Sequence, residues 1–338
     1  MKERKPALHP LAAIAIDIAV IGVLLGSFYY LNFLKDAEPI DPVQLPTLSP
    51  YVEPTATADL TTPNPSDITP TPDPTENPQY AGMFGEAVGD MLLAIGETPI
   101  VTENSYKSEN ISFTITQVQE NGITYFLTDI YIRELSCLRT AFASGSFAEY
   151  SPKWVYEIAE DNNALVAFSG DYCQFGNQGL VIRNGVLYRE VLSDTDVAVL
   201  YNDGTLAVYG PDELDLDYIK THGAYQAWCF GPSLLTESGE AKTTFNSTLM
   251  RANPRVAIGY YEPGHYCMLV VDGRQAGYSD GMTLSDMSIL FYELGCKVAY
   301  NLDGGVSATM AYNGTMYNNP PEDVRRVGDI IYFCEPDA

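Results

Sequence analysis

The chain has 338 residues and a net charge of −26, with 44 acidic side chains against 18 basic ones. Such an acidic excess argues against nucleic acids and anionic wall polymers as partners, because both would be repelled. The six cysteines lack the paired short spacing of a zinc site, so we expect neither a metal nor a cofactor.

The first 34 residues have the pattern of a membrane anchor. Lys2, Arg4 and Lys5 precede an almost wholly apolar run over residues 11–34. About 20 apolar residues suffice to cross a hydrocarbon core, and the basic flank stays in the cytoplasm. We therefore expect a cytoplasmic segment over 1–10 and one transmembrane helix over 11–34. A cleaved signal peptide is the alternative, but the run is too long and no small-residue cleavage site follows it.

Residues 35–81 have the composition of a stalk. Eleven of the 22 prolines lie between Glu38 and Tyr80, with Thr, Asn, Asp and Glu between them and no Lys or Arg. This segment cannot bury enough apolar surface to offset its chain entropy. We expect a disordered stalk that places the remaining chain, residues 82–338, outside the cell.

Strand and turn signals dominate residues 82–338, with the core expected over 111–336. Apolar segments flank Asn-Gly or Asn-Asp-Gly turns, the strongest local signal for a β-hairpin. Hairpins are predicted at 111–131, 180–189, 197–209 and 311–317. Helices are predicted at 152–161, 212–222 and 283–294. The predicted fold class is α+β, with a mixed, largely antiparallel sheet built of hairpins and a few flanking helices.

One stretch near the C-terminus combines features that packing alone rarely requires. The apolar segment 298–300 leads into Asn301-Leu-Asp-Gly-Gly305, and hydroxyl side chains follow at Ser307 and Thr309. A carboxylate and an amide at a strand end, beside two glycines that let a ligand approach the backbone, indicate a site.

Six motifs in chain order resemble those of the phosphodiester glycosidase family. They are Gly231-Pro-Ser-Leu234, Asn253-Pro-Arg255 with Ala257-Ile-Gly259, Val270-Val-Asp-Gly-Arg-Gln275, Ser279-Asp-Gly-Met-Thr-Leu284, Asn301-Leu-Asp-Gly-Gly305 and Arg325-Arg-Val-Gly-Asp-Ile-Ile-Tyr332. The resemblance covers about residues 111–336, and the anchor and stalk resemble membrane-tethered members from Gram-positive bacteria. The chain departs from the family at Val306, where a third glycine is usual.

The resemblance implies a hydrolase that cleaves the C1–O bond of a sugar-1-phosphodiester, similar to a GlcNAc-1-phosphodiester, in surface or exopolysaccharide-type glycans. A phosphate monoester leaves readily, so the site needs a cationic grip and a carboxylate more than a general acid.

The resemblance also assigns roles to candidate residues. Asp303 is the first candidate for the catalytic carboxylate, followed by Asp171 and Asp272. Arg255 and Arg274 are expected to bind phosphate, and we expect the functional groups to converge on one concave face. The remaining candidates for substrate binding are Asn301, Ser307 and Thr309 for sugar hydroxyls, the Gly304 and Gly305 N–H groups for phosphate, and Tyr172 for an aromatic contact.

Other interpretations remain open. An Asp before Gly is commonly a turn former, which applies above all to Asp272. Arg325 and Asp329 look more like a packing or ion-pair element. The domain is alternatively a non-catalytic glycan-binding module, or a metal-dependent phosphodiesterase with oxygen ligands, although its three histidines lack metal-binding spacing.

Overall fold

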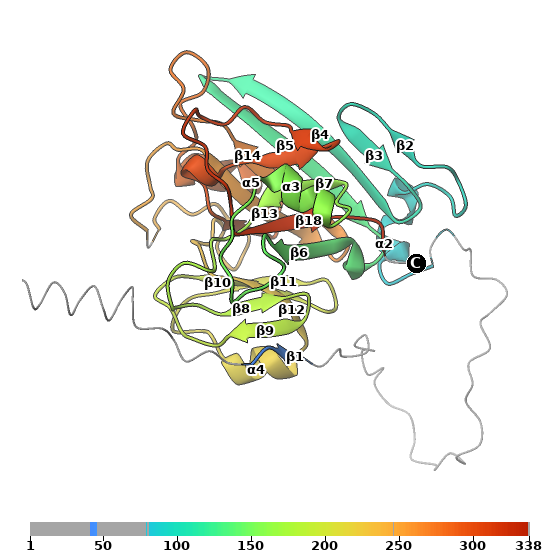
Figure 1. The fold of residues 1–338 in the computed structure, drawn as a ribbon, viewed down its shortest axis with the longest axis horizontal. Coiled ribbons are helices and arrows are strands. Elements are labelled where there is room, and N and C mark those ends of the chain that lie inside the picture. The colour runs from blue at the N-terminus through green and yellow to red at the C-terminus, as the bar shows by residue number, and fades with distance from the viewer. Residues whose placement is uncertain (1–40, 46–78, 80, 246, 337–338) are drawn as a thin grey trace, which may run out of the picture.

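The computed structural model describes residues 41–45, 79, 81–245 and 247–336 (Figure 1). The expected cytoplasmic segment and the expected membrane helix at 11–34 lie outside these residues, as does most of the expected stalk. Within the described residues, none of the helices combines the length and the apolar character needed to cross a bilayer.

In the part of the chain that the structure describes, eighteen strands form three sheets. The first sheet contains, in spatial order, β1 (Val43–Gln44), β9 (Val186–Arg189), β8 (Val181–Arg183), β12 (Ala224–Trp228), β10 (Val197–Tyr201) and β11 (Leu206–Tyr209). The second contains β15 (Val298–Asn301), β13 (Arg255–Glu262), β14 (His265–Val271), β5 (Ile123–Ile132), β4 (Ile111–Glu120), β3 (Ser105–Lys107) and β2 (Ile100–Val101). The third contains β17 (Thr315–Met316), β16 (Met310–Tyr312), β7 (Val166–Ser169), β18 (Asp329–Phe333) and β6 (Leu138–Phe142).

All pairings between the described strands are antiparallel. The prediction of largely antiparallel structure is therefore confirmed, but three sheets replace the single mixed sheet that we expected. The four predicted hairpins all form, as β4–β5, β8–β9, β10–β11 and β16–β17. Their Asn-Gly turns have positive φ at both residues, as at Asn121 (50°) and Gly122 (75°), which is the backbone that a tight hairpin turn requires.

The helices are short and cover the outer faces of the sheets. They are α2 (Gly85–Val88), α3 (Val155–Asp161), α4 (Leu216–Thr221) and α5 (Leu284–Glu293), with 3₁₀ turns η3 (Gly89–Met91), η4 (Leu135–Cys137) and η5 (Gly305–Ser307). Thr283 caps α5, because its hydroxyl accepts a hydrogen bond from Asp286 N at 3.1 Å. Leu284, Met287 and Phe291 of this helix pack against the second sheet.

The largest core cluster draws side chains from all three sheets. Phe113 on β4, Phe168 on β7, Trp228 on β12 and Phe333 on β18 are all fully buried in it. Figure 1 shows the first sheet at the bottom, the third sheet in the middle and the second sheet at the top. Because the sheets share one core, strand ends from different sheets come together, and this arrangement builds the candidate site.

Part of the expected stalk is docked on the domain. Strand β1 pairs with β9, with Val43 opposite Leu187, and Leu45 is only 5% exposed in the core of the first sheet. Leu45 N also donates to Gly185 O at 2.7 Å. The expectation of an unpacked stalk is therefore wrong for residues 41–45, because β1 pairs with β9 and Leu45 buries its side chain in the core of the first sheet.

Candidate functional site

The candidate site lies where the second and third sheets meet. Strand β15 ends at Asn301 and leads to Asp303, whereas β7 ends at Ser169 and leads to Asp171 and Tyr172. Asp303 N donates to Gly170 O at 3.2 Å, so the two strand ends are joined directly. Residues from segments more than 130 positions apart therefore share one place in the fold.

Asp303 carries the carboxylate at this junction. It is 8% exposed, and its Oδ2 accepts a hydrogen bond from Arg325 Nη2 at 2.9 Å. Burial raises the pKa of Asp303, while hydrogen bonds from Ser307 and Arg325 act in the opposite direction. The side chain is thus held as an acid with an elevated pKa beside a cation, which suits a group that takes a proton during a reaction.

Arg325 is a site residue that the roles assigned from the sequence missed. Its Nε donates to Ser307 Oγ at 2.7 Å, and its guanidinium lies 4.4 Å from the centre of the Tyr172 ring. The predicted ion-pair role is confirmed, but the partner is Asp303 itself. The sequence signal for this role was the Arg325-Arg-Val-Gly-Asp motif, which is one of the six motifs that resemble the family.

Backbone strain marks two of the predicted residues. Six described non-glycine residues have positive φ, and four of them are asparagines, which tolerate this conformation. The other two are Tyr172 (63°) and Arg274 (58°). Such strain costs on the order of 1–3 kcal/mol and clusters at functional sites. The structure therefore supports both residues as parts of the site.

Two arginines lie beside the Gly304–Gly305 turn without a carboxylate partner among the described residues. Arg274 Nη2 donates to Asn253 Oδ1 at 3.0 Å, and a Cβ on Gly305 would lie 3.1 Å from this nitrogen. Arg255 is 3% exposed and donates only to backbone carbonyls, through Nε to Met282 O and through Nη2 to Leu249 O and Arg251 O.

The pKa values reflect this uncompensated charge. Burial, with a smaller effect from Arg274, lowers the pKa of Arg255 to about 10. A pair of cations that lacks a protein anion favours binding of an anionic ligand. The guanidinium of Arg274 borders the turn that follows Asp303, so the cationic group and the carboxylate are neighbours.

The N–H group of Gly305 bonds within the protein, whereas the expected phosphate contact of the Gly304 N–H stays a prediction. Gly305 N donates to Pro254 O at 2.8 Å, so the expected phosphate contact from this N–H is wrong. A Cβ on Gly304 would approach Pro254 O to 2.6 Å, which explains why glycine is required there. Positive φ falls on Gly305 (60°), and Val306, inside η5, is not among the described residues with positive φ. The departure at Val306 therefore imposes no backbone strain.

Asp171 is a buried support and does not face the site opening. Its Oδ1 accepts from Arg183 Nη2 at 2.5 Å and its Oδ2 accepts from Cys229 N at 2.9 Å. The same Arg183 nitrogen lies 3.3 Å from Asp329 Oδ2. Burial and the nearby Asp171 raise the pKa of Asp329 to about 7. With both oxygens of Asp171 occupied, its expected catalytic role is not supported.

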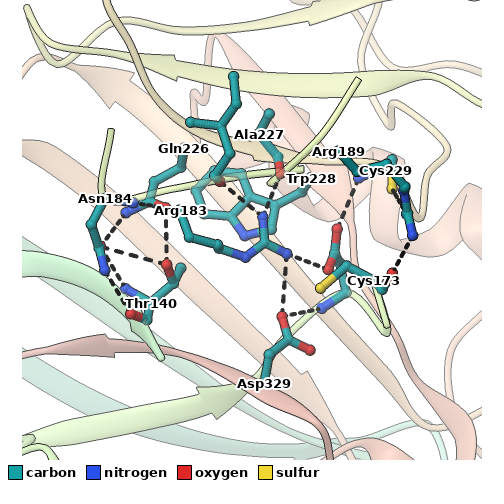
Figure 2. A network of polar contacts seen from close by, with 12 residues as sticks. Thr140, Cys173, Arg183, Asn184, Arg189, Gln226, Ala227, Trp228, Cys229 and Asp329 are labelled. Atoms are coloured by element: carbon teal, nitrogen blue, oxygen red, sulfur yellow. Dashed lines mark hydrogen bonds and ion pairs between the residues drawn. The ribbon is translucent and has the colours of Figure 1, made fainter. Parts of the chain in front are cut away.

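Figure 2 shows that Arg183 lies at the centre of a network joining the first and third sheets. Its Nη1 donates to Ala227 O on β12, while Asp329 begins β18. To one side, Gln226 Nε2 donates to Asn184 Oδ1 at 2.8 Å and Thr140 Oγ1 donates to Gln226 Oε1 at 3.0 Å (Figure 2). This polar layer holds the strand ends in position behind Asp303.

The network contains one group of potential metal ligands. Ligand atoms of Asp171, Cys173 and Asp329 lie within 4.8 Å of one another. Arg183 bonds to both carboxylates, and burial holds the pKa of the Cys173 thiol well above its usual value. A cation bound there would have to displace the guanidinium, so these residues do not fit a metal.

Asp272 is also a support. It is fully buried, and it accepts from Asn318 Nδ2 and Tyr278 Oη, both at 2.8 Å, and from Asn319 N at 3.1 Å. Burial raises its pKa against these hydrogen bonds. These partners lie 6, 46 and 47 positions away, so Asp272 is a buried structural partner of distant segments and not a former of its local turn. The expected convergence of the functional groups on one concave face stays a prediction.

The predicted sugar-binding side chains are buried around the turn. Asn301 Nδ2 donates to Gly231 O at 2.7 Å, whereas its Oδ1 is buried without a partner. Thr309 Oγ1 donates to Ser307 O at 3.1 Å, and Ser307 Oγ is bound by Arg325. All three residues are at most 1% exposed, so their side chains shape the turn that carries Asp303 and are not presented to a ligand.

Comparisons with known proteins agree with this arrangement. The sequence model of the phosphodiester glycosidase family matches residues 162–334. The SPbeta prophage-derived uncharacterized protein YomE of Bacillus subtilis is 30% identical over 261 residues, which are 70% of this chain and 40% of that protein. The N-acetylglucosamine-1-phosphodiester alpha-N-acetylglucosaminidase of Bos taurus is 30% identical over 108 residues, 30% of this chain and 20% of that protein.

The chain thus spans less than half the length of these two relatives. Among solved structures, the catalytic domain of the zebrafish N-acetylglucosamine-1-phosphodiester alpha-N-acetylglucosaminidase, auto-inhibited by its pro-peptide, has a TM-score of 0.53 at 21% identity. The match covers 67% of this chain and 83% of that one, and it shows a shared fold. From the family match over residues 162–334, we conclude that this chain belongs to the phosphodiester glycosidase family.

Proposed function

We propose that the chain hydrolyses the C1–O bond of a sugar-1-phosphodiester, of the kind formed by GlcNAc-1-phosphate, in surface or extracellular glycans. The observation that carries this proposal is that Asp303 pairs with one guanidinium group while a second borders the turn that follows it. Arg325 bonds to its carboxylate, and Arg274 lies against Gly305 two residues further along the chain. A carboxylate and cationic groups at one turn match the needs of a reaction at the carbon next to a phosphate.

The reaction is a displacement at C1. The bond between C1 and the bridging oxygen breaks, and its electron pair leaves with the phosphate monoester. A water oxygen bonds to C1, and Asp303 accepts the proton that the water loses. Arg274, together with Arg255 behind it, stabilises the charge that develops on the leaving phosphate. Since this leaving group is weakly basic, the scheme requires no second carboxyl group to protonate it.

Product analysis tests the proposal. The assay should use the chain from Glu38 onward, because a fragment of residues 82–338 would lack β1 and its pairing with β9. With a GlcNAc-1-phosphodiester in oxygen-18 water, we expect the label in the released sugar and unchanged turnover in the presence of a chelator. Label in the phosphate, or loss of activity on chelation, would instead support a metal-dependent phosphodiesterase. Absence of turnover with sugar binding retained would support the glycan-binding module.

The sequence supports an extracellular location for the domain, anchored by residues 11–34. A membrane-impermeant, amine-reactive label added to intact cells is expected to modify the exposed Lys153 of the domain. Labelling that appears only after the membrane is opened would reverse the orientation. A mature N-terminus near Ala37 would replace the anchor with a cleaved signal peptide.

A further inference from the structure

Two buried cysteines face each other between α5 and the second sheet. Cys267 lies on β14 and is 0% exposed, and Cys296 follows α5 and is 4% exposed. Their Sγ atoms are 3.8 Å apart, although the residues are 29 positions apart in the chain. Both side chains belong to the core cluster that the helix and the sheet share. Two thiols in contact, unlike a single cysteine, have a partner with which to form a covalent bond.

The two sulfurs meet across the strand that separates their own segments. Cys267 on β14 pairs with Gly259 on β13, and Gly259 pairs with Ala299 on β15. Cys296 comes just before β15, so its side chain reaches over β13 to meet Cys267. A Cβ on Gly259 would lie 2.6 Å from Cys267 Sγ and 2.9 Å from Cys296 Sγ. The sulfurs therefore occupy the space that any other residue at position 259 would fill.

The backbone itself does not demand this glycine. Gly259 is not among the described glycines with positive φ, so its conformation is open to other residues. A glycine inside a strand weakens the strand and commonly marks the close approach of another group. Here the approaching groups are two sulfur atoms, so position 259 is kept small for the pair.

The distance to a bonded geometry is short. An S–S bond is about 2.05 Å long, so the two sulfurs have to approach each other by about 1.8 Å, which small side-chain rotations supply. A third side chain lies against both sulfurs. Burial raises the pKa of the Tyr261 hydroxyl, and its interactions with the Cys267 and Cys296 sulfurs raise it further. Both sulfurs thus lie on the same side of β13, beside one hydroxyl.

We infer that Cys267 and Cys296 become joined as a disulfide when the chain folds in the presence of a disulfide oxidant. One thiolate attacks the oxidant's disulfide and releases one of its halves as a thiol. The second thiolate then displaces the other half, and the Sγ–Sγ bond forms. The two cysteines lose two protons and two electrons in total, and the oxidant's disulfide takes them up to become two thiols.

The surroundings indicate when the bond forms. Burial, reinforced by the hydrogen bond with Cys296, holds the pKa of the Cys267 thiol well above its usual value. Exchange requires the thiolate, so it takes place before α5 closes over the sheet, and the closed core afterwards shields the bond from reductants. The bond would fix the start of the segment that runs through β15 to Asp303. This inference does not depend on the proposed reaction.

The test is a peptide map of the full-length chain. The chain is synthesised in a cell-free system with detergent, either in a glutathione redox buffer or in dithiothreitol, and remaining thiols are blocked with N-ethylmaleimide in denaturant. Cleavage by trypsin after Arg255, Arg274 and Lys297 places the two cysteines in the separate peptides 256–274 and 275–297. Mass spectrometry should find these peptides linked after folding in glutathione, and both labelled after folding in dithiothreitol. Labelled peptides, or links to other cysteines, after folding in glutathione would overturn the inference.

Cys229→Ser is the matched control, because it also removes one thiol but lies outside this cluster, with its sulfur 3.9 Å from Arg189 Nη2. It should retain the link, whereas Cys267→Ser should leave Cys296 labelled. The rise in Tm on oxidation should be roughly 5–10 °C greater in Cys229→Ser than in Cys267→Ser, the scale for closing a loop of this length. Equal rises would reject the disulfide as a stabilising link. If Cys267→Ser does not fold, the peptide map of the wild type still decides.

Discussion

Asp303 and Arg325 lie 22 positions apart in the chain, and Arg325 Nη2 donates to Asp303 Oδ2 at 2.9 Å. This pair joins the end of β15 in one sheet to the start of β18 in another. The arginine keeps the buried carboxylate ionisable and at the same time orders the Tyr172 ring beneath it. Removing either partner therefore changes both charge and shape at the site.

Asp303→Asn should lower turnover of a glycosyl phosphodiester by on the order of 10²–10⁴, the range for a positioned acid–base group. The amide keeps the shape of the side chain but cannot accept the proton of the attacking water. Steady-state kinetics with circular dichroism as a folding check measure this. Asp212→Asn, an exposed substitution, is the control. Wild-type turnover in Asp303→Asn would remove Asp303 from the reaction.

Arg325→Lys should shift the acid limb of the pH–rate profile to higher pH. The pKa of Asp303 is already raised by burial, and the bond from Arg325 lowers it. Activity that needs the carboxylate is lost as the pH falls through this pKa, so losing the bond moves the limb upward. Arg326→Lys, at the exposed neighbour, should leave the profile unchanged. An unmoved limb in Arg325→Lys would show that another group controls it.

Arg274→Ala should raise the KM for a phosphodiester substrate by roughly 10-fold or more. The Arg274 guanidinium bonds to the neutral Asn253 amide and to no carboxylate among the described residues, so its charge is available to a phosphate. The loss of affinity for an uncharged glycoside inhibitor should be smaller. Arg255→Lys should weaken phosphate binding as well, since lysine keeps the charge but loses the planar donor geometry. Lys220→Ala, at a surface ion pair, is the control. Equal losses for charged and uncharged ligands would mean that Arg274 supports the turn and not the phosphate.

Folding stability should fall as the pH rises from about 4 through 7. The pKa of Asp329 is raised to about 7 in the folded protein, so the folded state binds a proton that the unfolded chain has released. Stability due to this proton is present at low pH and is lost as Asp329 ionises. Thermal denaturation across this range should show the slope, and Asp329→Asn should flatten it. A slope that persists unchanged in Asp329→Asn would assign it to other carboxyl groups.

Arg183→Met should destabilise the fold by about 3–5 kcal/mol, because it leaves Asp171 and Asp329 buried without their cation. Lys153→Met removes an exposed ion pair with Asp161 and should cost less than about 1 kcal/mol. Chemical denaturation of both variants gives the comparison. Equal losses would show that the buried network adds no more than a surface pair.

The sequence predicted the local elements of this fold well and the long-range arrangement less well. Asn-Gly turns are short-range signals, and they form hairpin turns where expected. The division into three sheets depends on contacts between distant strands, which no local pattern encodes. At the site, strand-end motifs indicated Asp303 and Tyr172, which the structure links through Arg325.

The same motifs could not distinguish a carboxylate that faces a ligand from one that bonds within the protein. Asp171 and Asp272 share the Asp303 pattern of an acid after a buried strand, yet their oxygens are taken by Arg183 and Asn318. Those partners lie 12 and 46 positions away. Arg325 was missed for the converse reason, since its role depends on meeting Asp303 in space.

If residues 11–34 anchor the chain as proposed, the docking of β1 on β9 limits how far the domain can stand from a membrane. Residues 43–44 are fixed on the first sheet, and Arg133 bonds to Gln79 O and Ala81 O. Only residues 35–42 then separate the proposed anchor from the folded surface, a reach of about 28 Å, compared with about 160 Å for a free stalk over 35–81. The domain would thus lie close to the bilayer, and a single proteolytic cut between 46 and 78 would leave it tethered there by β1.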